Sequence, residues 1–322
     1  MKLSIIIVAW NVREEIVNCL RSIEANRPRE NFEVIAVDNA SSDGTVETIR
    51  RNFPIAVLIP NNENRGFAAA NNQGLMKSHG DYILLLNPDT IVHPHSLDLL
   101  VEFMDDNADV GICGPKLLNS DGTTQPSVRR FPDFRSALYL YTVLKAWRLF
   151  RRQYRRYMMY DFTYNEQADV DQVAGAALMT RRSIMNELGG MDERFFMYYE
   201  EVDYCYRVKK AGWRIVFTPS VTITHIGARS ASQIPIENQQ MFIASVLKFF
   251  RKNRGAVATE FFCILFKPTV ILRYVSKLVF GIPKYVLALI LSDQRRQEKA
   301  MAKIKKSVVW LRRYTWSLLF EM

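Results

Sequence analysis

The 322-residue chain predicts an α/β fold, in which a mostly parallel sheet carries helices on both faces. Over the first 120 residues, short apolar runs alternate with longer segments of helical periodicity, the order that parallel strands joined by helices require. Apolar residues make up 48% of the sequence and charged residues 24%, a composition typical of proteins with a substantial core. Polar residues directly follow several of the runs, at the strand ends where such sheets bind ligands.

The first strand is predicted at 3–9, LSIIIVA, a continuous apolar run that suits a strand buried on both faces. A helix follows at 12–25, because Ile16, Leu20 and Ile23 recur on one face. The same alternation predicts strands at 32–38, 54–60, 81–86 and 110–118, and helices at 67–77, at 94–105 and around Val46 and Ile49.

The alternation breaks at about 123–168, which we interpret as an insertion or lid. Its segment KAWRLFRRQYRR (145–156) has six basic residues in twelve. The pattern then resumes and ends in a long helical region, so we divide the chain into an α/β domain at 1–235 and a helical region at 236–322. Between the insertion and that region we expect a strand at 171–180, helices at 181–190 and 195–212, and an extended segment at 213–225.

The net charge of +10 is concentrated near the C-terminus, where residues 248–315 hold 16 Lys and Arg against three acidic residues. Because these cations are mixed with apolar and aromatic side chains, we expect this tail to lie on an anionic membrane surface. Nucleic acid is not expected as a partner, because no nucleic-acid-binding module is recognisable. The alternative is a pair of amphipathic helices packed on the domain or in a homo-oligomer interface. No run approaches the ~20 apolar residues of a spanning helix, so attachment would be peripheral.

Four cysteines lie far apart and form no CxxC pair, which argues against a disulfide framework and fits a reducing compartment. The N-terminal MKLSIIIVAWN lacks the long apolar core of a secretory segment, so it is interpreted as a strand. GxGxxG does not occur, which leaves a dinucleotide-dependent oxidoreductase unsupported.

Acidic residues and one histidine mark a candidate cation site. Asp89 follows a buried strand, and His225 ends an extended segment far along the chain. A carboxylate and a neutral imidazole can share Mg²⁺ or Mn²⁺, which would hold a diphosphate, while a second carboxylate serves as general base. Each residue alone also has an ordinary role, as a helix cap, a helix-dipole partner or a hydrogen-bonded histidine. The remaining polar residues at strand and helix ends are Trp10, Asn11, Asp38, Asn39, Asn87, Glu200, Glu201 and Asp203.

Seven motifs along residues 3–232 closely resemble the family 2 glycosyltransferases, especially the rhamnosyltransferase-like branch. The resemblance implies a GT-A fold, a nucleoside-diphosphate sugar donor, a divalent metal ion (Mg²⁺ or Mn²⁺) and transfer with inversion. In order, the motifs are SIIIVAWN, VDNASSDGT, NRGFAAANNQG, GDYILLLNPDT, VAGAALMTRR, LGGMDERFFMYYEEVDYCYRVKKAGWRI and THIGARS.

The resemblance also implies roles for individual residues. Asp89, in an NPD sequence that replaces the family's DxD-type motif, and His225 would bind the metal ion. The family's ED pair reads Glu200-Glu201 here, which implies Glu201 as the general base and Asp203 as the alternative. Arg229 follows His225 closely, and it either contacts the diphosphate or is a surface arginine. The nucleotide-sugar site would comprise Ala9, Trp10, Asn11, Asp38, Asn39, Asn64, Arg65, Gly66, Asn71 and Asn87, with Asp38 recognising the base.

The expected function is therefore transfer of a sugar, L-rhamnose from dTDP-rhamnose, to a lipid-linked saccharide or cell-surface glycan at the cytoplasmic face of a membrane. A processive polysaccharide synthase is a rival, but it would need a QxxRW motif and spanning helices, and neither is found. The departures at Asn87 and Glu201 leave open a second rival, a catalytically inactive glycan-binding or scaffold protein.

Overall fold

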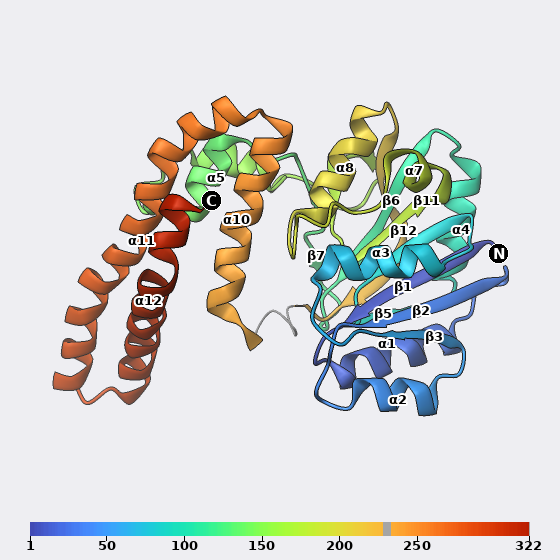
Figure 1. Cartoon of the computed structure of the whole chain (residues 1–322), viewed down its shortest axis with the longest axis horizontal. Coiled ribbons are helices and arrows are strands. Elements are labelled where there is room, and N and C mark those ends of the chain that lie inside the picture. Colours follow the sequence, from blue (N-terminus) through green and yellow to red (C-terminus); the bar gives the residue numbers. More distant parts are fainter. Residues whose placement is uncertain (228–232, 322) are drawn as a thin grey trace. The chain divides into compact units, whose positions relative to one another are not determined.

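A computed structural model describes residues 1–227 and 233–321 of the chain (Figure 1). The chain forms two compact units, each built from two separate stretches of sequence. The first unit comprises Met1–Phe131 and Met159–Gln233, and the second comprises Pro132–Met158 and Ile234–Met322.

The first unit is built around a mixed sheet, to which ten strands of the described chain belong. Their order is β3-β2-β1-β4-β11-β6-β12-β5, with β7 paired to β6 and β9 to β12. The strands are β1 (Leu3–Ala9), β2 (Phe32–Asp38), β3 (Ala56–Pro60), β4 (Tyr82–Leu86), β5 (Thr90–Val92), β6 (Val110–Leu118), β7 (Thr124–Gln125), β9 (Ala168–Asp169), β11 (Ala177–Arg181) and β12 (Arg214–His225). A separate pair joins β8 (Val128–Arg129) to β10 (Gln172–Val173).

The sheet is parallel in its first half and mixed in its second. β3, β2, β1 and β4 run parallel to one another, whereas β11 is antiparallel to both β4 and β6. β12 is parallel to β6 but antiparallel to β5. The α/β fold expected from the sequence is confirmed, and the antiparallel pairings of β11 and β5 make its sheet mixed.

Helices cover both faces of this sheet. Ile5 and Ile7 of β1 pack with α1, α2 and α4 in one apolar cluster, whereas Ile6 packs with α3, α7 and α8 in another. Figure 1 shows α3 on one side of β1 and both α1 and α2 on the other. Alternate side chains of β1 thus enter two cores, which explains why the strand is apolar throughout. These helices are α1 (Arg13–Ala25), α2 (Thr45–Asn52), α3 (Phe67–Lys77), α4 (Ser96–Asp106), α7 (Arg182–Leu188) and α8 (Glu200–Lys210).

Three sequence-based element predictions are wrong in detail. The helix expected at 195–212 begins only at Glu200, because Tyr198 and Tyr199 have φ angles of +69° and +71°, which no right-handed helix accommodates. The strand expected at 171–180 is divided into β10 and β11 by an irregular stretch at 174–176. The short strand β5 was not expected at all; it pairs with β12 at the end of the sheet order.

The second unit is helical and combines part of the basic insertion with the C-terminal helices. The ring of Phe134 lies 4.7 Å from the rings of both Phe250 and Phe262. The insertion therefore shares an aromatic core with the C-terminal helices, a pairing that the sequence did not indicate. The helices are α5 (Phe134–Tyr141), the 3₁₀ helix η1 (Val143–Lys145), α6 (Arg151–Tyr157), α10 (Pro235–Asn253), α11 (Ala256–Ile290) and α12 (Gln294–Phe320).

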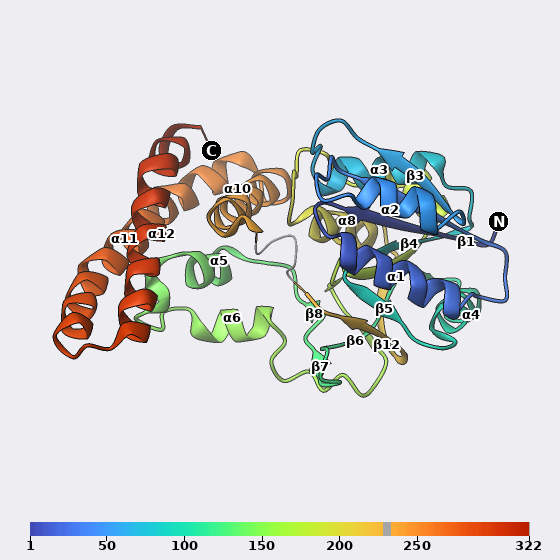
Figure 2. The ribbon, with the colours of Figure 1, turned by 90° about the horizontal axis from the view of Figure 1, so that it is seen from below.

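The helices α11 and α12 form a long hairpin and lie side by side in both views (Figures 1 and 2). Tyr274 stacks on Trp310 with ring centroids 3.8 Å apart, and the backbone of Gly281 passes close to Ile304. Among residues 1–227 and 233–321, no helix combines the length and hydropathy that crossing a bilayer requires.

Candidate functional site

Three neighbouring parallel strands deliver polar residues to one edge of the sheet. β1 pairs with β2 so that Ala9 lies opposite Asp38, and it pairs with β4 so that Ile7 lies opposite Leu86. The residues after these strand ends must therefore be neighbours. The structure thus brings together the sequence-predicted residues Trp10, Asn11, Asn39, Asn87 and Asp89.

Asp38 is buried at this edge and has one oxygen without a partner. Its Oδ2 accepts a hydrogen bond from the Ser41 N–H at 2.9 Å, and the side chain of Asn11 holds the same turn by accepting from the Ser42 N–H. The Oδ1 of Asp38 is fully buried but accepts no hydrogen bond within the described chain. A buried unsatisfied carboxylate oxygen is costly, and an N–H donor of a bound base would satisfy it.

Asn39 holds the loop that leads into α3. Its Nδ2 donates to Asn64 Oδ1 at 3.0 Å and to the Gly66 carbonyl at 3.1 Å, and its Oδ1 accepts from the Arg65 N–H at 3.1 Å. Gly66 has φ +85°, and a Cβ there would lie 2.5 Å from the carbonyl oxygen of Phe196. The loop conformation therefore depends on a glycine at this position, and it leaves the Arg65 side chain exposed.

Asn71 lies farther along α3, where it is buried and donates to the Phe67 carbonyl at 2.8 Å. Arg229 lies outside the described residues.

Asp89 and His225 meet although 136 positions separate them in the printed sequence. The pairing of β12 with β5 aligns His225 with Thr90, the residue after Asp89. As a result, His225 Nε2 lies 3.3 Å from Asp89 Oδ1, and the amide of Asn87 lies 3.5 Å from the same nitrogen. Strand β5 thus brings together Asp89 and His225, the two residues predicted to bind a cation.

Gln125 fixes the orientation of the His225 ring. Its Nε2 donates to the carbonyl of His225 at 3.1 Å and to Asn119 Oδ1 at 2.9 Å, which assigns the two ends of the amide. Its Oε1 lies 2.7 Å from His225 Nδ1. Because an amide oxygen only accepts, Nδ1 must carry a proton, and Nε2 is the ring nitrogen that faces Asp89 and whose lone pair could bind a cation.

The Asp89–His225 pair fits a cation that its substrate helps to hold. Within the described chain, no three His, Cys, Asp or Glu side chains come together as a complete metal site. Mg²⁺ and similar ions, however, commonly bind one or two protein groups and take their other ligands from phosphate oxygens and water. The oxygen of Asp89 and the lone pair of His225 are suitable donors for such an ion.

Glu200 and Glu201 are neighbouring carboxyl groups at the start of α8, where Glu200 is buried and Glu201 is half-buried. Each has an Oε2 atom that is buried without a hydrogen-bond partner. Burial and the charge of Glu201 raise the pKa of Glu200 well above its usual value. Burial also raises the pKa of Glu201, but the guanidinium of Arg129 opposes that rise. The charge of Arg129 therefore favours ionisation of Glu201 over that of Glu200.

A glycine lets Glu201 lie close to the backbone that contacts the NPD segment. A Cβ added at Gly175 would lie 3.4 Å from both Cβ and Cγ of Glu201. The next residue, Ala176, accepts a hydrogen bond from the Asn87 N–H at 2.9 Å. Glu201 and the Asn87–Asp89 turn thus contact two successive residues of one backbone stretch.

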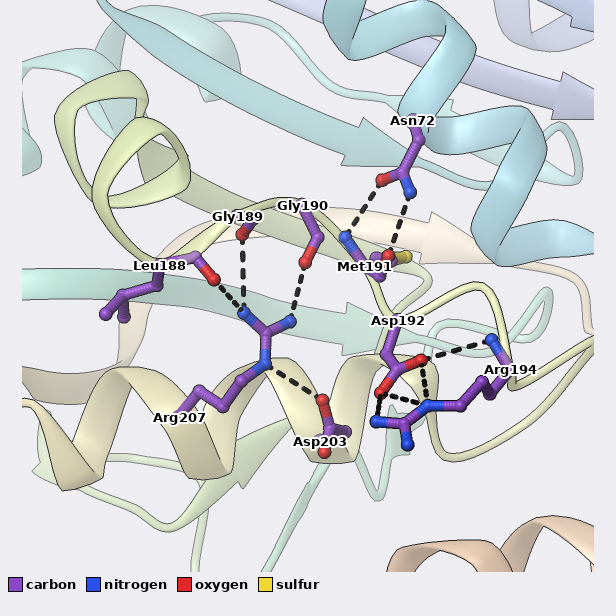
Figure 3. A network of polar contacts seen from close by, with 9 residues as sticks. All are labelled: Asn72, Leu188, Gly189, Gly190, Met191, Asp192, Arg194, Asp203 and Arg207. Atoms are coloured by element: carbon purple, nitrogen blue, oxygen red, sulfur yellow. Dashed lines mark hydrogen bonds and ion pairs between the residues drawn. The ribbon is translucent and has the colours of Figure 1, made fainter. Parts of the chain in front are cut away.

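Asp203 occupies a different environment, shown in Figure 3. It is fully buried and its Oδ2 accepts from Arg207 Nε at 2.9 Å. The same guanidinium donates to the carbonyls of Leu188 and Gly190, at 2.8 and 2.6 Å. Asn72 completes the support by exchanging two hydrogen bonds with the backbone of Met191. Asp203 therefore helps to position the 188–191 turn through Arg207.

We expect Asp203→Asn to destabilise the first unit while leaving the candidate base intact. Removing one partner of a buried ion pair costs about 3 kcal/mol, whereas Asp109→Asn breaks an exposed pair with Arg214 and should cost much less. Denaturant unfolding of both variants measures the difference. A variant at position 203 with normal stability and no turnover would instead make Asp203 the base.

Gln125 and Arg129 were missed by sequence reasoning. Both belong to the 123–168 segment that was interpreted as an insertion within the α/β domain, and both lie within the first unit. Gln125 belongs to β7, which pairs with β6, and no local sequence signal relates it to a histidine at position 225. Only the pairing of distant strands reveals its role.

Comparison with known proteins gives one family. Residues 4–188 match the family model described as glycosyl transferase family 2. An N-acetylglucosaminyl-diphospho-decaprenol L-rhamnosyltransferase of Mycobacterium tuberculosis is 30% identical over 230 residues, which cover 66% of this chain and 72% of that protein. Agl10, a low-salt glycan biosynthesis hexosyltransferase of Haloferax volcanii, is 24% identical, with 87% of this chain and 89% of that protein covered.

A solved structure shares the fold. Mannosyltransferase PcManGT from Pyrobaculum calidifontis, in complex with GDP-Man and Mn²⁺, superposes with a TM-score of 0.55 at 18% identity. The superposition covers 99% of this chain and 87% of that chain. The expected GT-A fold is therefore confirmed.

Proposed function

The chain belongs to glycosyl transferase family 2, and we propose that it transfers L-rhamnose from dTDP-rhamnose to a hydroxyl group of a lipid-linked saccharide, with inversion at the anomeric carbon. The M. tuberculosis relative, whose name states an L-rhamnosyl transfer to a diphospho-decaprenol acceptor, supports the donor and the acceptor class. The observation that carries the proposal is the meeting of Asp89 and His225 at the sheet edge, 3.3 Å apart.

Asp38 supports a pyrimidine nucleotide as the donor's carrier. Thymine and uracil each present one ring N–H flanked by two carbonyl oxygens, and that N–H can donate to the unpartnered Oδ1 of Asp38. The half-buried Trp10 follows Ala9 at the same edge and offers an aromatic face to the base.

Asp89 and His225 would hold Mg²⁺ or Mn²⁺ against the diphosphate, where the ion neutralises charge that develops on the leaving group. Gln125 keeps the lone pair of His225 directed at that position. Glu201 accepts the proton of the attacking acceptor hydroxyl as the new bond forms. With only one carboxylate in this role and no enzyme-linked sugar, attack occurs in line with the leaving diphosphate, and the anomeric configuration inverts.

A donor screen tests the proposal. With Mn²⁺ or Mg²⁺ present, dTDP- and UDP-sugars should raise the melting temperature more than GDP- or ADP-sugars do, because Asp38 pairs with the pyrimidine imide, and dTDP-rhamnose should be the donor that is turned over. Product formed on a lipid-linked acceptor should show the inverted anomer by NMR. Stabilisation by a purine nucleotide sugar alone, or retention of configuration, would contradict the proposal.

We further propose that the protein lies peripherally on the cytoplasmic face of the membrane through its second unit. One face of α11 carries a series of exposed apolar side chains at helical spacing, interrupted at Pro268, and each is between 37% and 74% exposed. Such a face next to lysines and arginines is typical of helices that lie in an anionic interface. This apolar stripe consists of Val257, Phe261, Ile264, Leu272, Val275, Val279, Ile282, Val286 and Ile290.

The full chain should float with vesicles that contain phosphatidylglycerol and should not float with pure phosphatidylcholine vesicles. Phe261→Ser with Ile264→Ser should weaken binding on the order of 100-fold, because each side chain contributes about 1.5 kcal/mol or more when it leaves water. Met76→Ser is the matched control, since Met76 is equally exposed on α3 of the first unit. Equal flotation of all three proteins would refute the membrane role of the stripe.

A further inference from the structure

A cavity of about 450 Å³ lies between α11 and α12 in the second unit. It is built from one face of each helix, so it belongs to the hairpin alone. Its lining residues are Ser276, Lys277, Phe280, Gly281, Lys284, Leu287, Ala288 and Leu291 of α11 or its end, and Arg296, Lys299, Ala300 and Lys303 of α12.

The charges around this cavity are all positive. None of its lining residues is acidic, and of its five cations only Arg296 has an ion pair in the described chain, with Asp293 at 3.0 Å. Lys277 is half-buried and lies 4.7 Å from the centre of the Tyr274 ring. Burial and the nearby cations Arg273, Lys303 and Lys306 lower the pKa of Lys277 to about 8. Four of the five lining cations thus have no ion-pair partner in the described chain, and a bound anion would supply one.

The other part of the lining is apolar. Phe280, Leu287 and Leu291 line the cavity although each is more than half exposed to solvent. Phe280 and Leu287 directly follow Val279 and Val286, two members of the apolar stripe. Cations and exposed apolar side chains in one cavity match a ligand that is anionic at one end and apolar at the other.

We propose that this cavity binds the anionic phosphate headgroup of a membrane lipid, with Lys277, Lys284, Lys299 and Lys303 around the phosphate and the hydrocarbon chain against Phe280, Leu287 and Leu291. The inference rests on the proposed membrane association and adds a specific site to it. An anionic phospholipid and a polyprenyl diphosphate both have this chemistry. A small soluble anion would leave the apolar lining without a partner.

The test uses the full chain and two charge-matched double variants. Lys277→Gln with Lys303→Gln removes two cations of the cavity, whereas Arg295→Gln with Lys305→Gln removes two exposed cations of α12 that do not line it. For vesicles that contain the preferred lipid, the cavity variant should bind about 10- to 30-fold more weakly than the control, since each lysine near a lipid phosphate strengthens binding about fivefold. If both variants lose vesicle binding equally, the effect comes from surface charge in general and the proposed site is wrong.

Three arms distinguish the source of the phosphate. Phosphatidylcholine vesicles carry either phosphatidylglycerol or a polyprenyl diphosphate, and inorganic diphosphate is added alone in the third arm. The lipid arm in which the cavity variant loses most binding identifies the ligand class. If inorganic diphosphate binds as tightly as either lipid, the apolar lining contributes nothing and the lipid proposal is wrong.

Amine acylation read by mass spectrometry reports on Lys277 directly. At neutral pH an amine with a lowered pKa reacts faster than ordinary lysines, and a phosphate in the cavity should slow its acylation more than that of Lys305. Absence of selective protection would refute the site even if flotation is unchanged. Donor hydrolysis by the first unit is measured in parallel, so failure of the proposed transferase activity is seen separately from failure of this site.

Discussion

Glu201→Gln is expected to lower the rate of sugar transfer by about 10²–10⁴-fold, because it removes the group that accepts the hydroxyl proton. Donor binding should change little, since glutamine keeps the shape of the side chain beside Gly175. Steady-state turnover and the donor dissociation constant separate these two effects. If the variant loses donor affinity and turnover together, the role of Glu201 is to position the substrate.

The pH dependence offers an independent check on the carboxyl pair. Burial raises the pKa of Glu201, so the acid limb of kcat/KM should lie above the ordinary range of a glutamate and turnover should rise with pH through it. Glu200→Gln replaces the member of the pair that keeps its proton, so this limb should stay in place.

The free energy of unfolding should also depend on pH, in the direction that the raised pKa of Glu200 implies. A carboxyl group whose pKa is raised by folding stabilises the fold fully only below its unfolded pKa, and this contribution is lost as the pH rises through the folded value. A glutamine at position 200 does not ionise, so Glu200→Gln should be more stable than the wild type at neutral pH. Below about pH 4, where Glu200 is protonated in both the folded and the unfolded state, the two proteins should be equally stable. A variant that is less stable at neutral pH would mean that the Glu200 carboxylate has a partner that favours its charge.

The sequence predicted the local elements of the first unit well. Strands at 3–9, 32–38 and 110–118 and the helix at 67–77 appear at the predicted bounds. Their apolar patterns are set by neighbours within a few residues, which is why local periodicity locates them.

Features that depend on distant pairing could not be predicted in the same way. Strand β5 has only three residues and exists because β12 pairs with it. The role of Gln125 depends on β12, because that strand ends in His225. Likewise, the sequence placed the whole 123–168 segment in one insertion, whereas contacts assign its parts to two units. In each case the decisive information is a contact between residues far apart in sequence.

The second large effect on turnover is expected at Asp89, which together with His225 would bind the metal ion. Asp89→Asn is expected to lower metal-dependent turnover by about 10²–10⁴-fold, because a divalent ion contributes several kcal/mol of charge stabilisation at the leaving group. Stabilisation of the protein by Mn²⁺ together with nucleoside diphosphate should also disappear, which a thermal melt measures without any catalysis. Asp106→Asn, on the exposed end of α4, is the charge-matched control.

Gln125→Leu provides a graded test of the same pair. The change removes the acceptor of the His225 Nδ1 proton but leaves both proposed metal-binding groups in place. Residues that orient a metal-binding histidine typically contribute 10- to 100-fold to metal affinity, so the Mn²⁺ requirement should shift by about that factor. Saturating Mn²⁺ should then restore turnover in Gln125→Leu but not in Asp89→Asn. If saturating metal fails to restore Gln125→Leu, Gln125 does not act through the metal site.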